Sequence, residues 1–187
     1  MTQPETLNAL YGTYRLARLD AGGLDYFEPT VDAFWRSFKA ALLIAPFYGL
    51  LLALRYQSGE IGTSAWHYGA IEIVAYVTAW VAFPVLMLSV SKRFGCAHNY
   101  LRFMVAYNWA AVPQNMLYLP IAMLSVTGII SADAAGFFAL LALALIIGYV
   151  WFITRTALEI PVVGAAAIVA MDFAISILIN GYVEGLH

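Results

Sequence analysis

The chain has 187 residues, of which 63% are apolar and only 11% are charged. A soluble domain is about 45–50% apolar and about 25% charged, so this composition excludes an ordinary soluble domain and predicts an integral membrane protein. The formal net charge of −2 excludes a basic nucleic-acid-binding protein, and the single cysteine, Cys96, excludes a disulfide framework.

The first 30 residues form an N-terminal segment that is too polar to cross a membrane. The segment lacks the basic, apolar and small-residue regions of a cleaved signal peptide, so we expect it to be retained in the mature protein. Leu7, Leu10, Tyr11 and Tyr14 recur at helical spacing, which predicts a short amphipathic helix on the membrane surface. The alternative is a frayed tail, because so short a helix is marginal without packing.

Turn-forming residues follow this predicted helix. Ala-Gly-Gly at 21–23 is expected to end it, and Asp25–Pro29 is expected to form an extended link. Thr30 and Asp32 are both suitable N-caps for the helix that follows. The transmembrane domain is therefore predicted to begin near residue 31.

Residues 31–187 alternate long apolar runs with short polar breaks, which is typical of an all-α integral membrane protein. Each run is close to the roughly 20 residues that cross about 30 Å of hydrocarbon. We therefore predict a five-transmembrane-helix bundle preceded by a short cytoplasmic or interfacial segment. The predicted transmembrane helices are Phe34–Tyr56, Trp66–Val90, Phe103–Thr127, Phe137–Thr154 and Pro161–Val183.

Basic residues are distributed unevenly about these helices. Of the nine Lys and Arg residues, all but Arg55 lie before the first helix, in its first two turns, or in the second-to-third and fourth-to-fifth connections. Basic residues concentrate on the cytoplasmic side of a membrane. The N-terminus is therefore predicted to be cytoplasmic and the C-terminus to lie outside.

Five polar side chains are predicted to lie at membrane depth, where burial is costly: Glu72, Asn108, Gln114, Asn115 and Asp172. Small residues share the face of Glu72, so this side chain is expected to point into the bundle. Asp172 is expected to hydrogen-bond across to the third helix, where Gln114 and Asn115 lie at a similar depth. The polar groups are interpreted either as hydrogen-bonding partners that hold the helices together or as a path for protons, ions or a polar ligand.

Small residues form a ridge on the fifth predicted helix, at Ala166, Ala170 and Ala174. Such ridges let helix backbones approach closely in lipid. The ridge is therefore predicted to pack either within the bundle or against a partner.

No motif of a hydrolase, a nucleotide-binding protein or a metalloprotease occurs in the sequence. Cys96 and His98 are too few to form a closed metal site. We therefore expect no enzymatic activity, no cofactor and no metal centre.

Two stretches resemble the Yip family, the Ypt/Rab-interacting membrane proteins, which has bacterial relatives. YLRFMVAYNWAAVPQNML, beginning at Tyr100, resembles the entry to the family's third helix, and YVWFITRTALEIPVVGAAAIV, beginning at Tyr149, resembles its aromatic stretch, basic turn and small-residue fifth helix. The predicted five-helix topology is similar as well, over residues 31–183. The aspartate-tyrosine-glycine-proline motif of eukaryotic members is absent. The resemblance implies a non-enzymatic membrane scaffold, in a bacterial inner membrane, and assigns no site residues.

Two functions remain open from the sequence. The leading interpretation is a scaffold or accessory subunit whose partners are the lipid bilayer and a membrane protein or second copy of the chain, without nucleic acid. The alternative is a small transporter or proton-coupled channel component that uses the intramembrane carboxyl and amide groups, since proline-interrupted helices mark binding sites in transporters.

Overall fold

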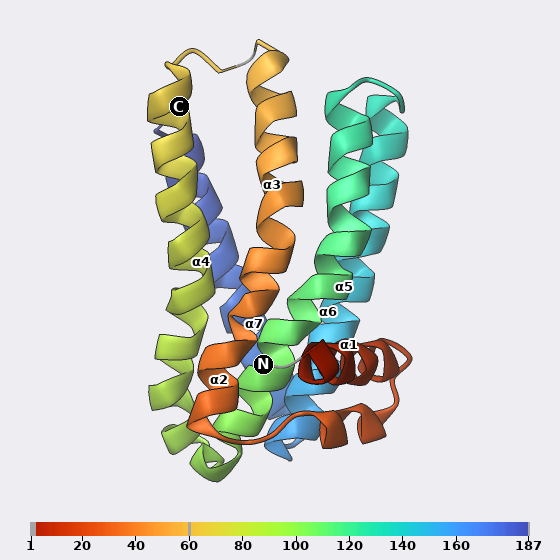
Figure 1. Cartoon of the computed structure of the whole chain (residues 1–187), viewed down its shortest axis with the longest axis vertical. Coiled ribbons are helices and arrows are strands. Elements are labelled where there is room, and N and C mark those ends of the chain that lie inside the picture. Colours follow the sequence, from red (N-terminus) through yellow and green to blue (C-terminus); the bar gives the residue numbers. More distant parts are fainter. Residues whose placement is uncertain (1–2, 60, 187) are drawn as a thin grey trace.

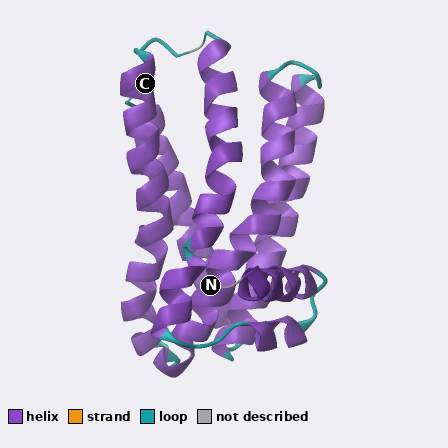
Figure 2. Cartoon of the chain, viewed as in Figure 1, coloured by secondary structure: helices purple, strands orange, loops and turns teal. Residues whose placement is uncertain are grey.

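The computed structural model describes residues 3–59 and 61–186, which form helices joined by short loops and no strand (Figure 2). The elements in chain order are α1 (Gln3–Ala17), the 3-10 helix η1 (Ala21–Tyr26), α2 (Val31–Ser37), α3 (Lys39–Gln57), α4 (Ala65–Arg93), the 3-10 helix η2 (Ala97–Asn99), α5 (Tyr100–Val126), α6 (Ala132–Leu158) and α7 (Val162–Glu184).

Five long helices, α3 to α7, run side by side along the long axis, and α1 lies across one end of them (Figure 1). Each neighbouring pair packs together around a ring in the order α3, α4, α7, α6 and α5, and α5 closes the ring against α3. We call the end that carries α1 the α1 end, and the opposite end the far end. The α3–α4 and α5–α6 connections lie at the far end, together with the end of α7.

Among the described residues, four helical segments are long and apolar enough to cross a membrane. They are Val31–Gln57, which joins α2 and α3, and the helices α4, α6 and α7. The fifth long helix, α5, is not among them, so the structure shows four such segments rather than the five predicted. The physical reason is that α5 carries Asn108, Gln114 and Asn115 and is covered by other helices, so fewer of its side chains need to be apolar.

The N-terminal segment is helical rather than frayed, and its exit differs from the prediction. α1 ends at Ala17, before the predicted stop at 21–23, and Ala21–Tyr26 form η1, so the start of the predicted extended link, Asp25 and Tyr26, is helical. The Asp20 side chain accepts a hydrogen bond from the Gly22 amide and caps η1. Thr30, and not Asp32, caps α2 by accepting from the Ala33 amide. The first predicted transmembrane helix is also divided, since α2 ends before Phe38 and α3 follows it.

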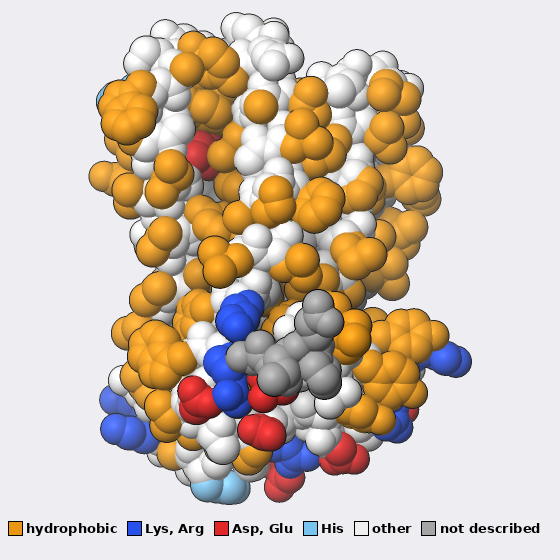
Figure 3. All heavy atoms as spheres, viewed as in Figure 1, with side chains coloured by type: hydrophobic (Ala, Val, Ile, Leu, Met, Phe, Trp, Pro, Cys, Tyr) orange, Lys and Arg blue, Asp and Glu red, His pale blue; other side chains and the backbone are white. Residues whose placement is uncertain are grey.

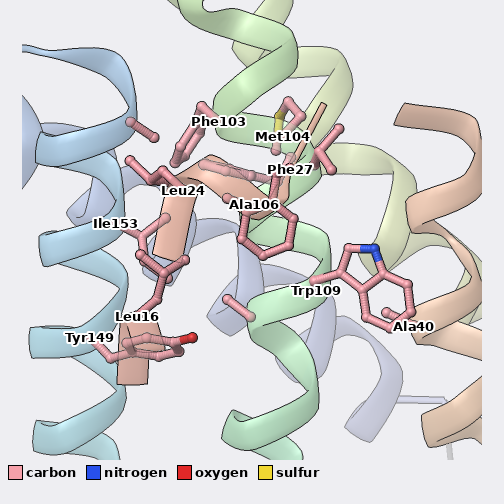
Figure 4. Close-up of a cluster of buried hydrophobic side chains, with 14 of the residues drawn as sticks. Leu16, Leu24, Phe27, Ala40, Phe103, Met104, Ala106, Trp109, Tyr149 and Ile153 are labelled. Atoms are coloured by element: carbon pink, nitrogen blue, oxygen red, sulfur yellow. The ribbon is translucent and has the colours of Figure 1, made fainter. Parts of the chain in front are cut away.

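A dense apolar core fills the α1 end (Figure 4). Leu16 of α1, with Leu24 and Phe27 at η1, is buried against side chains of α5 and α6 that include Phe103 and Ile153. This packing stabilises α1, which would be only marginally stable as an isolated short helix, because α1 buries one face against the bundle. The N-terminal segment is therefore part of the same core as the long helices.

Candidate functional site

Two cavities lined by both polar and apolar side chains lie between the long helices. The large cavity has a volume of about 770 Å³ and lies between α3, α4, α5 and α7. The small cavity has a volume of about 330 Å³ and lies between α5, α6 and α7. Four residues of α5 line both of them, so the cavities adjoin along one face of this helix: Tyr107, Gln114, Asn115 and Tyr118.

All five polar side chains singled out in the sequence line these cavities. Glu72 and Asn108 line the large cavity, Asp172 lines the small one, and Gln114 and Asn115 line both. The residues come from α4, α5 and α7, so the fold brings together groups that lie up to 100 positions apart in the chain. This adjacency follows from the ring arrangement of the helices and was not deducible from the spacing of these residues in the chain.

Glu72 is the most deeply buried carboxyl group of the large cavity, with 5% of the residue exposed. The Tyr48 hydroxyl of α3 donates a hydrogen bond of 2.8 Å to its Oε2 atom. A carboxyl group inside a helical bundle needs such a donor, because lipid offers none. The bond also connects α3 to α4, which a second hydrogen bond joins as well, from the Tyr76 hydroxyl to the Ala41 carbonyl at 2.7 Å.

Asp172 occupies the equivalent position in the small cavity. Both carboxyl oxygens lie 2.8 Å from the Tyr107 hydroxyl of α5, which donates one proton between them. The expected hydrogen bond from α7 to the third predicted transmembrane helix is therefore present, but its donor is Tyr107 and not the pair Gln114 and Asn115. The Asn115 amide instead donates to the Ala111 carbonyl of its own helix, at 2.9 Å.

Asn108 forms the floor of the large cavity on α5. Its Nδ2 group donates to Ser37 Oγ at 2.8 Å, and Ser37 Oγ donates to the Phe34 carbonyl at 2.6 Å. The Oδ1 atom is buried and accepts no hydrogen bond from the described residues. Such an atom costs about 1–3 kcal/mol relative to a satisfied one.

Three aromatic rings, which we call the aromatic plug, pack together beside the cavities on the side of the α1 end: Phe83, Phe103 and Tyr107. The centroids of Phe83 and Tyr107 lie 4.6 Å apart, and that of Phe103 lies 5.7 Å from Tyr107. Phe83 and Phe103 are at most 2% exposed. Tyr107 belongs both to the plug and to the wall of each cavity, so plug and cavities meet at this residue.

At the far end the large cavity reaches the surface. Arg55 at the end of α3 and Glu184 at the end of α7 both line it, and Glu184 is exposed. The cavity thus extends from two opposite charges at the far end to Asn108 of α5.

Several residues that line the cavities were not predicted from the sequence. Tyr48 and Tyr107 look like ordinary aromatic residues of apolar helices, and only the structure pairs them with carboxyl groups. Tyr68 and Trp80 could have been found, because they repeat at four-residue intervals with Glu72 and therefore share its face of α4.

The ridge of Ala166, Ala170 and Ala174 lies outside the cavities. All three residues are exposed, whereas the neighbouring Ala165 and Val169 are buried. The ridge therefore does not pack within the bundle, and packing against a partner stays a prediction.

No metal-binding group of three His, Cys, Asp or Glu side chains occurs within residues 3–59 and 61–186. Cys96 is a buried free thiol in the α4–α5 connection, and burial raises its pKa. A thiol that resists deprotonation is a poor metal ligand.

Comparison with known proteins finds no matching family model, no matching curated protein and no matching solved structure. The resemblance to the Yip family stays a prediction that depends on the two sequence stretches.

Proposed function

We propose that this chain is a non-enzymatic multi-pass membrane protein that admits protons and a small polar solute into its bundle, as a transporter or channel component. The observation that carries the proposal is the convergence of Glu72, Asp172 and three amide side chains of α5 on two adjoining cavities. Charged groups at membrane depth are costly, and a polar cavity around them is what a hydrophilic path requires. A bundle held together only by buried hydrogen bonds would need no such space.

The proposal includes five membrane-crossing helices, with α5 as the fifth. Its support is that α5 is 27 residues long and runs beside the four apolar segments (Figure 1). At 1.5 Å per residue such a helix is about 40 Å long, enough to cross a bilayer. Because other helices cover α5, its polar residues are shielded from lipid within the bilayer.

The proposed orientation places the α1 end in the cytoplasm. The proposed membrane is the inner membrane of a bacterium. Support comes from the basic side chains, which gather near the α1 end in Figure 3, while the rest of that face is mainly apolar. Reporter fusions at residue 187 and in the α5–α6 connection test this orientation. Activity of a cytoplasm-only reporter at either place would contradict it.

In this orientation the large cavity reaches the outer surface and the aromatic plug lies on the cytoplasmic side. Glu72 lies about 10 Å along α4 from the far end, and Asp172 about 15 Å along α7 from the α1 end, at 1.5 Å per residue. The two carboxyl groups are thus staggered along the path. Since Tyr107 belongs to the plug and donates to Asp172, a change of charge at Asp172 reaches the plug through a single hydrogen bond.

Proton flux into proteoliposomes tests the proposal. The purified chain is reconstituted with a lumenal pH dye, and a potassium gradient with valinomycin drives proton entry. We expect acidification faster than in empty liposomes, and at least tenfold slower flux in Glu72→Gln and Asp172→Asn, which keep the side-chain shapes. Asp133→Asn is the matched control, because Asp133 is an exposed carboxyl in the first turn of α6. Wild-type flux equal to that of empty liposomes would contradict the proposal.

The second candidate function is a scaffold or accessory subunit, and one observation favours it. The exposed ridge of Ala166, Ala170 and Ala174 offers a surface for close helix packing with a membrane-protein partner or a second copy. Ala170→Leu would then disrupt an assembly seen by native mass spectrometry in detergent. An unchanged mass distribution would count against this candidate.

A further inference from the structure

Four side chains of α4 form a column along the wall of the large cavity. Tyr68, Glu72, Tyr76 and Trp80 follow one another at intervals of four residues, and all of them line the cavity. Residues at this interval lie above one another on a helix. The carboxyl group of Glu72 therefore has an aromatic ring one turn away on either side.

Two tyrosines of α3 stack on the tyrosines of this column. The Tyr48 and Tyr76 rings are stacked with centroids 5.2 Å apart and planes 24° apart, and the Tyr56 and Tyr68 rings are stacked at 5.9 Å and 25°. Tyr48 also donates the hydrogen bond to Glu72. Glu72 thus lies between two stacked tyrosine pairs, each of which has one ring from α3 and one from α4.

Aromatic faces and a buried carboxylate together favour an organic cation. The negative face that each stacked ring leaves uncovered attracts a cation, and walls of several rings are the known way in which proteins bind quaternary ammonium groups. A metal cation is a poor alternative, because calcium takes six to eight oxygen ligands and no three-carboxylate or mixed metal cluster occurs among the described residues.

The charges of the cavity agree with a cationic ligand. Its described lining includes the carboxyl groups of Glu72 and Glu184 and the guanidinium of Arg55. Arg55 lies at the mouth, seven residues along α3 from Tyr48, whereas Glu72 lies deeper. The deep part of the cavity is therefore acidic, and its volume of about 770 Å³ exceeds what a small ammonium ion needs.

We propose that the large cavity binds an organic ammonium ion, with Glu72 as its counter-charge and the rings of Tyr48, Tyr68 and Tyr76 as its walls. This inference rests on the proposed function, since it names the class of solute that the cavity admits.

Calorimetry on the full chain in detergent tests the inference with choline and 3,3-dimethylbutan-1-ol, which has the same shape and no charge. We expect choline to bind at least tenfold more tightly than the neutral alcohol. Glu72→Gln is expected to weaken choline binding at least tenfold and to leave binding of the alcohol unchanged. Asp133→Asn, at an exposed site on another helix, is expected to bind choline as the wild type does.

Tyr68 separates a ring effect from a folding defect. Tyr68→Phe keeps the aromatic face and should retain choline affinity within about twofold, whereas Tyr68→Leu should lose about threefold to thirtyfold, the range of one cation–π contact. Thermal unfolding of both variants without ligand identifies any loss that comes from misfolding. Equal affinity for choline and the alcohol, or full choline affinity in Glu72→Gln, would overturn the inference.

The flux and binding measurements distinguish a failure of the transport proposal from a failure of the ammonium-site proposal. Proton flux without preferential choline binding would overturn the ammonium site and leave the transport proposal intact. Choline binding without flux would support the ammonium site and contradict transport. Absence of both would reject the two proposals together.

Discussion

The two ends of the bundle are constructed in opposite ways. At the α1 end, α1, η1 and α2 pack against the long helices, and the side chains of Leu16, Phe103 and Trp109 are at most 1% exposed. Side chains also connect neighbouring helices there, as where the Tyr100 hydroxyl donates to the Pro84 carbonyl at 3.0 Å. Toward the far end the long helices enclose a polar cavity instead of a core.

This difference separates stability from the proposed function. A cavity and buried polar groups lower stability, whereas a close-packed core supplies it. A protein that opens a polar space in one half can do so if its other half holds the helices together. Substitutions at the two ends should therefore have effects of different size and kind.

The largest effect is expected from Phe103→Ala in the core of the α1 end. Phe103 is fully buried, so its truncation should lower the free energy of unfolding by about 3–5 kcal/mol. Thermal unfolding in detergent measures the loss. Phe137→Ala is the matched control, because Phe137 lies at the far end with 65% of the residue exposed, and its loss should be within about 0.5 kcal/mol. Equal losses would contradict the division between the two ends.

The next largest effect is expected at Gly12, where α1 approaches η1. A Cβ atom at Gly12 would lie 2.7 Å from Tyr26 Cβ and 2.8 Å from the Gly23 carbonyl oxygen, so alanine cannot be accommodated without displacing η1. Gly12→Ala should therefore destabilise the protein by about 1–3 kcal/mol, although alanine favours helices.

Gly148→Ala on α6 is expected to change the free energy of unfolding in the opposite direction. No atom lies within 4 Å of a Cβ at this position, so only helix propensity acts. A gain of up to about 1 kcal/mol is expected from the same measurement. A gain at both glycines would show that α1 does not need its close contact with η1.

A smaller effect is expected in the cavities. Asp172→Asn and Tyr107→Phe each alter the hydrogen bond between α7 and α5, and such bonds in membranes average about 0.6 kcal/mol. Because the two residues share one bond, the double variant should lose less than the sum of the single losses. Unfolding of all three variants measures this coupling, and additive losses would show that Tyr107 and Asp172 do not interact.

The sequence predicted the long helices well because apolar runs of membrane length are a strong signal. It was less informative about α5. This helix is covered by other helices and can carry polar residues, so its composition does not mark it as a membrane-crossing segment. The five polar candidates were found because charged and amide groups are rare in such runs. Their partners Tyr48 and Tyr107 were not, because a buried tyrosine has the same signature whether its hydroxyl meets a carboxyl group or a carbonyl.

The smallest effect is expected at the junction of α1 and η1, which is the part of the α1 end that remains sensitive to pH. Arg15 donates to Asp20 Oδ2 at 2.7 Å, and the Gly22 amide donates to Oδ1 at 3.0 Å. The hydrogen bond from Arg15, followed by that from Gly22, lowers the pKa of Asp20 below its usual value. A carboxyl group with a lowered pKa in the folded state stabilises that state fully above its unfolded pKa of about 3.9, and this stabilisation is lost as the pH falls through the lower, folded value.

Asp20→Asn should remove this contribution while keeping a residue that can cap η1. Both proteins are expected to lose stability in acid, because acid protonates carboxylates that the folded state of a protein stabilises. The loss should be smaller in Asp20→Asn, and the difference between the two unfolding curves isolates Asp20 from the other carboxyl groups. At pH 7 the wild type should be slightly more stable than the variant, since only the carboxylate has the charge that attracts Arg15. Parallel curves from pH 7 to pH 3 would show that the Arg15–Asp20 pair does not stabilise the junction of α1 and η1.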